Sequence, residues 1–310
     1  MKTKNTYKFQ EEIYFKDLII IAWNYKFSIF LITAFFSLAS VIYSLQIPNM
    51  YKSEALMSLA DANNGSSDIS RYSGLASLAG INLPQSATED KISLAIENIR
   101  SREMVERLIK DESILVGLMA AKGFNWTTKT LEIDESIYDV SNSNWLRKPA
   151  GPFKERPSLL EAHRVYSKAL SIKREGTFFT IAIEHISPIF AKTLLTKIIK
   201  ETNNINIEKD KQESYLALQY LASESSKTSV QEIRDSINAL ISAQLQTQML
   251  ANIREEYLIK AIDRPYVPEF KTAPNRAVLC IIGTIFGFIF GLIFTLIRLF
   301  VSQNRLKEEN

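Results

Sequence analysis

The chain has 310 residues, 46% of them hydrophobic, and a formal net charge of +3 at pH 7. This length allows two globular domains, or one domain together with membrane segments. The positive excess lies in the two ends of the chain, so it does not indicate nucleic-acid binding. Cys280 is the single cysteine, so no disulfide can form within the chain and burial must hold the fold together.

Two uncharged apolar stretches occur, at residues 27–47 and 277–297. As helices each is roughly 31 Å long, which matches a hydrocarbon core of about 30 Å. A buried helix of a soluble protein normally keeps a polar face, and these stretches have none. We therefore predict two transmembrane helices. The first is too long for the apolar part of a signal peptide and follows 26 residues, so we expect it to remain as an anchor.

The charges beside these stretches predict the orientation of the chain. Residues 1–26 carry five lysines against three acidic residues, and residues 298–310 carry three basic against two acidic residues. The positive-inside rule places both flanks in the cytoplasm. Residues 48–276, whose charges cancel, are then expected in the periplasm, or outside a one-membrane cell. The prediction is a multi-pass protein of the bacterial inner membrane with two cytoplasmic tails.

The residues after the first stretch predict a strand, a loop and a helix. Residues 50–60 alternate, which is typical of a half-buried strand. One predicted face holds Ser53, Ala55, Met57 and Leu59, and the other holds Lys52, Glu54 and Ser58. Residues 61–88 are rich in Asn, Gly and Ser and predict a loop. From Thr88 to about Lys110, apolar residues at helical spacing predict one helix capped by Thr88.

The middle of the chain predicts mixed structure. Residues 111–156 are expected to form short helices and irregular segments. Pro157 and Ser158 predict the start of a helix that continues to about residue 167. Two strands are expected at residues 169–173 and 177–185, joined by a turn at 174–176.

The stretch from about 188 to 263 predicts long helices. Ser187 suits an N-cap, Pro188 suits the first helical position, and no Gly or Pro follows within the stretch. A single helix of this length would extend about 110 Å. Both of its ends adjoin elements expected near the membrane, so we predict a helical hairpin. The weakest helical sequences are Thr202–Asn206 and Ser223–Ser229, and the second lies near the midpoint.

The second half of this hairpin carries an apolar stripe at intervals of three or four residues. Its members are Val230, Ile233, Ile237, Leu240, Ile241, Leu245, Met249, Ile253 and Tyr257. One modest domain cannot cover a stripe of this length, so we predict that part of it contacts a neighbouring subunit. The expected fold class is an α+β membrane protein. Two transmembrane helices flank a periplasmic domain with an α/β base and a long extended α-helical hairpin.

Prolines and glycines mark the second membrane stretch. Pro265, Pro268 and Pro274 predict a stiff, extended segment before it. Gly283, Gly287 and Gly291 then recur every four residues, which gives one helix face a flat stripe that another helix can approach closely. The alternative is that these glycines reflect only the frequency of glycine in membrane helices.

This proline segment, followed by membrane glycines, resembles the signature of the Wzz-like chain-length determinants in the polysaccharide co-polymerase family. The family pattern is Pro-x2-Pro-x4-Ser-Pro-Lys. Pro265, Pro268 and Pro274 match it, whereas Ala273 replaces the Ser and Asn275 replaces the Lys, with Arg276 one residue later. The segment from Gly74 to Gly80, the helix with Ser101 and Arg102, and the Ser187–Pro188 junction are also similar to the family.

The resemblance implies a function in lipopolysaccharide biosynthesis. Such a protein forms a bell-shaped homo-oligomer, associates with the integral-membrane O-antigen polymerase, and regulates the modal length of O-antigen chains without catalysis. Lipid-linked polysaccharide and the lipid bilayer are the other implied partners. A capsule or exopolysaccharide export co-polymerase without a kinase domain is the alternative, and the 13 residues after Ile297 are too few for a fused tyrosine kinase. A two-span receptor and an efflux-pump adaptor are more distant alternatives.

The sequence predicts no catalytic, cofactor or metal site. The two histidines, His163 and His185, have no metal-ligand spacing, and no phosphate-binding glycine loop is present. Four aromatic residues could stack on sugar rings, although aromatic residues in a domain of this size are more often part of the core. They are Phe124, Trp126, Tyr138 and Trp145.

Overall fold

The computed structural model describes residues 23, 25–60, 87–149, 151, 154–227 and 231–308. The chain divides into two compact units. One unit consists of Met1–Asn49 and Thr272–Asn310, and the other is Met50–Lys271. Most of the N-terminal tail predicted at 1–26, and residues 61–86 of the predicted loop, lie outside the described residues.

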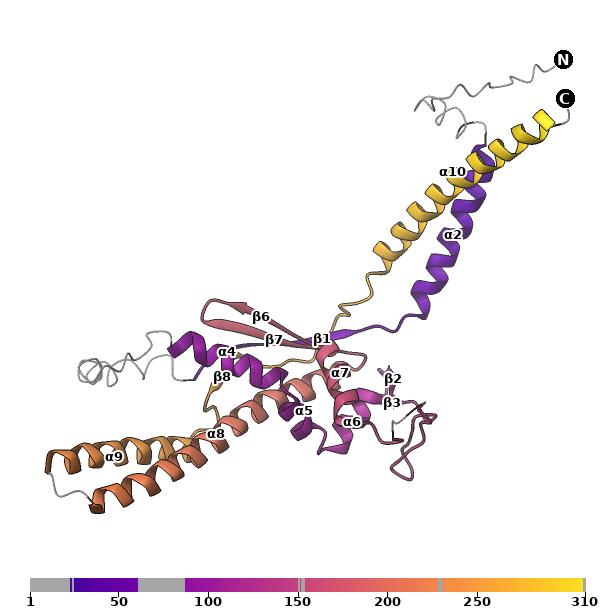
Figure 1. Ribbon diagram of the computed structural model, residues 1–310. Coiled ribbons are helices and arrows are strands. Elements are labelled where there is room, and N and C mark those ends of the chain that lie inside the picture. Colours follow the sequence, from indigo (N-terminus) through magenta and orange to yellow (C-terminus); the bar gives the residue numbers. More distant parts are fainter. Residues whose placement is uncertain are drawn as a thin grey trace. The chain divides into compact units, whose positions relative to one another are not determined.

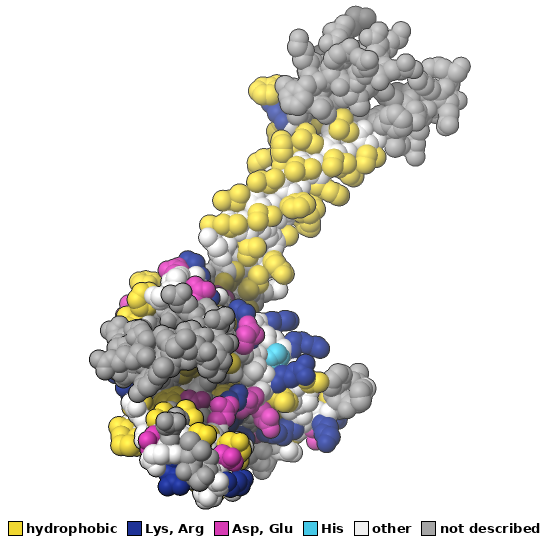
Figure 2. All heavy atoms as spheres, turned by 60° about the vertical axis from the view of Figure 1, so that its left-hand side comes forward, with side chains coloured by type: hydrophobic (Ala, Val, Ile, Leu, Met, Phe, Trp, Pro, Cys, Tyr) yellow, Lys and Arg dark blue, Asp and Glu magenta, His cyan; other side chains and the backbone are white. Residues whose placement is uncertain are grey.

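The first unit is a pair of helices, α2 (Lys26–Gln46) and α10 (Arg276–Glu308), which lie side by side (Figure 1). Lys26–Gln46 and Arg276–Arg298 are each long and apolar enough to cross a membrane. Hydrophobic side chains cover the visible face of this pair (Figure 2), and Phe30 and Phe286 are 72% and 65% exposed. Such a surface suits hydrocarbon and not water.

The second unit contains a four-stranded antiparallel sheet with the strand order β6-β7-β1-β8. Its strands are β1 (Tyr51–Leu59), β6 (Leu170–Glu175), β7 (Phe178–His185) and β8 (Ile259–Asp263). The predicted strand at 50–60 and the hairpin of β6 and β7 are confirmed. Gly176 lies in the hairpin turn with a φ of 63°, which glycine adopts without strain.

The alternation predicted for β1 is correct except at Ser58. Ser53, Ala55, Met57 and Leu59 are buried, and Lys52 and Glu54 are half-buried. Ser58 was expected on the exposed face but is also buried. The reason is that β7 and β8 both pair with β1 at this position and flank it on both sides.

The single helix predicted from Thr88 to Lys110 is wrong, because the chain forms two helices there. They are α4 (Ala87–Arg100) and α5 (Arg102–Leu108). Ser101 between them has an extended backbone, and its Oγ accepts a hydrogen bond from the N–H of Met104. The chain therefore ends one helix and caps the next at this serine. Asp111 caps α6 (Glu112–Met119) in the same way, by accepting from the N–H of Ser113.

Residues 120–145 contain strands that the sequence did not predict. Two small antiparallel sheets form there. They are β2 (Ala121–Asn125) with β3 (Thr130–Ile133), and β4 (Tyr138–Asp139) with β5 (Asn144–Trp145). The predicted helix after Pro157 is confirmed as α7 (Leu159–Ala169), and Ser158 and Glu161 form a capping box at its start.

The predicted helical hairpin is confirmed as α8 (Pro188–Lys227) and α9 (Gln231–Ile253), which lie side by side (Figure 1). The Oγ of Ser187 accepts from the N–H of Phe190 and caps α8. The first helix ends at Lys227, within the second of the two weak regions, and residues 228–230 lie outside the described residues. Thr202–Asn206, the first weak region, remains helical. Helix was also predicted up to about 263, but α9 ends at Ile253 because β8 pairs with β1.

Asn203 explains why the first weak region stays helical. Its side chain is buried and binds the start of β8 with three hydrogen bonds. Oδ1 accepts from the N–H groups of Leu258 (2.8 Å) and Ile259 (3.0 Å), and Nδ2 donates to the carbonyl of Ile259 (3.0 Å). The polar side chain therefore joins α8 to the edge strand through which the chain leaves the sheet.

Replacement of Asn203 by Ala should destabilise the second unit by about 2–4 kcal/mol, because buried backbone groups of Leu258 and Ile259 lose their partners. Thermal unfolding of the full chain in detergent, followed by circular dichroism, measures this loss. The matched control is Asn204→Ala, which removes only one 3.4 Å contact to Glu201 and should change stability far less. Equal stability of the two variants would contradict the role assigned to Asn203.

Candidate functional site

The glycines of α10 lie against α2. A Cβ at Gly287 would be 2.7 Å from the Cβ of Phe36 and 3.2 Å from the Cα of Thr33. A Cβ at Gly283 would collide with the side chain of Ser40. At Gly291 the nearest atoms, all of Ile29, would be 3.4 Å away, which is ordinary contact. The two backbones can approach this closely only because Gly287 and Gly283 have no side chain.

Hydroxyl groups join the same two helix faces. The Oγ of Ser40 donates to the carbonyl of Leu279 (2.9 Å), and the Oγ1 of Thr284 lies 3.3 Å from the Oγ of Ser37. Hydrogen bonds between membrane helices contribute about 0.6 kcal/mol each on average. These contacts were not predicted from the sequence, although Ser37, Ser40 and Ser44 recur at helical spacing in a largely apolar stretch and were the available signal.

The Gly287→Ala substitution should separate the helix pair, because the new Cβ would press on the backbone of Thr33. The matched control is Gly291→Ala, where the methyl group fits at 3.4 Å. Cysteines at Ser37 and Thr284, in a chain with Cys280→Ser, report the approach because their oxygen atoms lie 3.3 Å apart. The free thiols that remain after oxidation are counted. Disulfide formation between positions 37 and 284 should be slower in Gly287→Ala than in the parent chain, and unchanged in Gly291→Ala. Equal bridging in both variants would contradict the close contact.

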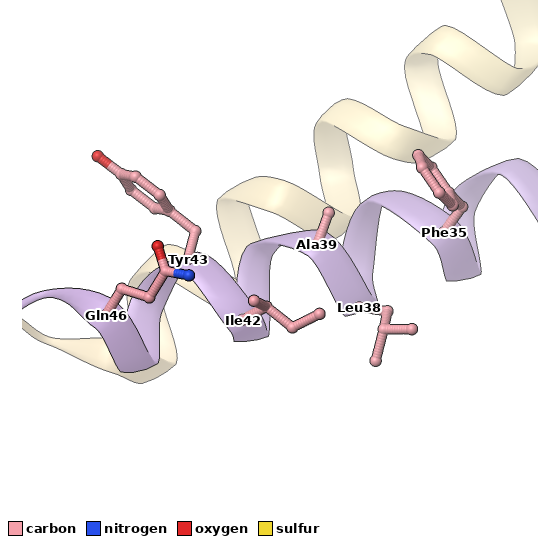
Figure 3. A pocket seen from close by; sticks show the side chains of 6 residues that line it. All are labelled: Phe35, Leu38, Ala39, Ile42, Tyr43 and Gln46. Atoms are coloured by element: carbon pink, nitrogen blue, oxygen red, sulfur yellow. The ribbon is translucent and has the colours of Figure 1, made fainter.

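A shallow apolar groove of about 350 Å³ lies on another face of the first unit, and all of its lining comes from α2 (Figure 3). Its lining residues are Phe35, Leu38, Ala39, Ile42, Tyr43 and Gln46. Tyr43 and Gln46 provide polar groups only at the C-terminal end of the helix (Figure 3). Such a lining offers a surface for apolar chains and no acid–base chemistry.

The proline segment has no helix or strand over most of its length. Pro268 is buried, whereas Pro265 and Pro274 are half-buried. Within the second unit, the Oγ of Ser53 on β1 donates to the carbonyl of Tyr266 (2.7 Å) and holds the segment beside the sheet. Within the first unit, Nη2 of Arg276 donates to Oδ1 of Asn49 (3.1 Å), which joins the start of α10 to the residues after α2.

The predicted apolar stripe lies on α9 as far as Ile253 and is mostly exposed, whereas Tyr257, its last predicted member, follows the end of the helix. The exposed fraction is 48% for Ile233, 53% for Leu240, 47% for Leu245 and 62% for Met249. Ile237 is buried within the unit and Ile241 is half-buried. Val230 lies outside the described residues. Most of the stripe is therefore left uncovered by α8.

The histidines make structural hydrogen bonds. Nε2 of His163 lies 2.9 Å from the carbonyl of Arg100. His185 is buried at the end of β7, where Nε2 lies 3.0 Å from the carbonyl of Gly117 and Nδ1 accepts from the N–H of Ser187. Burial lowers the pKa of His185 to about 4, so the ring is neutral near pH 7 and joins β7 to α6 and α8. Within the described parts of the chain, no group of three His, Cys, Asp or Glu residues could hold a metal ion.

The aromatic residues divide into core and surface. Tyr138 and Trp145 are buried with their ring centroids 4.9 Å apart, and Nε1 of Trp145 donates to Glu112. Phe124 is half-buried. The expectation that these residues form core is wrong for Trp126, which is 53% exposed. Trp126 follows the last residue of β2 and therefore lies in the turn between β2 and β3.

These features are those of a mixed helix-and-sheet protein with a candidate membrane anchor of two helices. The chain combines helices and an antiparallel sheet, and it carries two candidate membrane-spanning helices, one on each side of the mixed unit in sequence. Its most distinctive features are the glycine contact of the helix pair and the exposed stripe of the helical hairpin.

One known family matches part of the chain. Residues 11–112 match the family model "Wzz: Chain length determinant protein", so the resemblance to the Wzz chain-length determinants is confirmed over these residues. They include α2, β1, α4 and α5. No curated protein sequence matches the chain.

Several solved structures are similar to the chain, among them two polysaccharide co-polymerases. One is a full-length bacterial polysaccharide co-polymerase, with 10% identity, a TM-score of 0.38, and coverage of 95% of this chain and 98% of the other. The second is a fragment of the polysaccharide co-polymerase WzzB from Salmonella Typhimurium, with 14% identity, a TM-score of 0.28, and coverage of 73% and 100%.

Proposed function

We propose that this protein regulates the modal length of lipopolysaccharide O-antigen chains as a non-catalytic, oligomeric co-polymerase. The observation that carries the proposal is the family match over residues 11–112, which joins the first apolar helix to the central strand of the sheet. The protein would act on a separate membrane polymerase and shift the balance between elongation and release of the growing polymer.

The proposed topology places both termini in the cytoplasm and residues 48–276 in the periplasm. The supporting observation is the excess of basic residues in both flanks of the apolar helices. In this arrangement α2 and α10 would hold each subunit in the inner membrane. The glycine contact would keep the two helices together as one anchor.

The exposed stripe of α9 is the proposed contact between subunits. A monomeric soluble unit rarely leaves a contiguous row of large apolar side chains in water, and such rows mark interfaces. Neighbouring hairpins that cover this row would form the wall of a homo-oligomer. The growing lipid-linked polysaccharide would then meet several subunits at once.

Lipopolysaccharide gels from a strain that lacks this gene test the proposed function. We expect the deletion to abolish the preferred chain length, and expression of the wild-type chain to restore it. A ladder unchanged by deletion would contradict O-antigen regulation. In that case a changed amount or size of secreted polysaccharide would identify an export co-polymerase.

Paired substitutions Leu240→Lys and Met249→Lys should weaken the oligomer without unfolding the subunit, because both side chains are already more than half exposed. Light scattering in detergent should show a shift to smaller species, and gels should show a broader distribution of chain lengths. Gln246→Lys, an exposed polar position on the same helix, is the matched control. Wild-type assembly in the double variant would exclude this face as the subunit contact.

A further inference from the structure

Trp126 is an exposed aromatic side chain on a rigid support. Its ring centroid lies 5.4 Å from that of Tyr51 and 5.2 Å from that of Phe124, both in edge-on geometry. Oδ1 of Asn125 accepts from the N–H groups of Thr127 (3.0 Å) and Thr128 (3.2 Å) and orders the turn. The two ring contacts and the ordered turn therefore hold the indole in place, and 53% of its surface remains exposed. The fold does not use this surface.

The covalent chain limits how far this cluster can lie from the membrane. Tyr51 follows the end of α2 at Gln46 by five residues, which span at most about 17 Å when fully extended. A second connection leaves the same end of the sheet, since Ser53 binds the carbonyl of Tyr266 and α10 begins at Arg276. Phe270 in this connection is 83% exposed.

The chemistry of the hairpin matches that of a lipid headgroup layer. Tryptophan is enriched at membrane–water interfaces, where its apolar ring and polar N–H face different surroundings. Lys122 and Lys129 on the same hairpin are both exposed and outnumber its one acidic residue, Glu132, and basic side chains are attracted to anionic lipids. A glycan could also stack on an indole, but the short connection from Gln46 favours the bilayer.

We propose that the β2–β3 hairpin inserts Trp126 into the headgroup layer of the membrane that α2 enters. This contact would give each subunit a third attachment to the bilayer, besides α2 and α10, and would fix the tilt of the sheet relative to the membrane. The inference does not depend on the proposed control of polymer length or on which side of the membrane the sheet lies.

A fluorescent label at the hairpin turn tests the insertion in the full chain. Thr127→Cys, in a chain with Cys280→Ser, is labelled with an environment-sensitive dye and placed in nanodiscs of zwitterionic and anionic lipids. A spin label on the lipid headgroups serves as the quencher. The control label is at Ser223→Cys on α8. His185 pairs with Tyr51 just before α8 begins, and Ser223 is 35 residues along that helix, or about 50 Å away.

Quenching at position 127 should be at least about twofold stronger than at position 223. Trp126→Ala should reduce this quenching to the control level, whereas Trp126→Tyr should preserve most of it. Circular dichroism checks that each variant is folded. Equal quenching at the two positions, or quenching unchanged by Trp126→Ala, would overturn the proposal. A dye response to added oligosaccharide without lipid quenching would also overturn it and would indicate a glycan site.

Discussion

Antiparallel pairing of β1 with both β7 and β8 is the interaction on which the arrangement of the second unit depends. β1 brings the chain into the sheet shortly after α2, and β8 takes it out before the segment that leads to α10. Because antiparallel neighbours run in opposite directions, the chain leaves the sheet at the end where it entered. The long helices between β7 and β8 must then double back, and a hairpin results. Asn203 stabilises this route by joining α8 directly to β8.

The helix pair depends on a different physical effect. Lipid surrounds membrane helices with hydrocarbon, so burial of apolar side chains provides no net drive for association, and close packing has to provide it. Gly283 and Gly287 bring the backbones of α10 and α2 together where any other residue would collide. Ser37, Ser40 and Thr284 then reach across the contact and form hydrogen bonds that a wider spacing would not allow.

Two of the exposed apolar surfaces of the second unit have different characters. The α9 stripe is long, aliphatic and regular, as expected of a helix that meets another helix. Trp126 is an exposed aromatic residue on a small, ordered hairpin, and its ring packs on Tyr51, which follows the end of α2 by five residues. The first suits a subunit contact and the second suits a lipid interface. Together they would orient the hairpin and the sheet without any catalytic group.

The sequence alone determined the elements whose signals are local. The apolar stretches, the Ser158 and Ser187 caps, the alternation of β1 and the division into the two long helices were all readable, because each depends on residues close together in the chain. The family resemblance and the glycine spacing were readable for the same reason.

Tertiary structure decided the rest. Thr202–Asn206 looked like a helix break, but it stays helical because Asn203 finds its partners about 55 residues later, in β8. Residues 259–263 have a helix-like composition, yet they form a strand because the edge of β1 offers them hydrogen bonds. The exposure of Trp126 depends on how the β2–β3 hairpin packs on Tyr51. In each case the residues that determine the structure are far apart in the chain. The local periodicity of the sequence does not show which distant residues will contact each other.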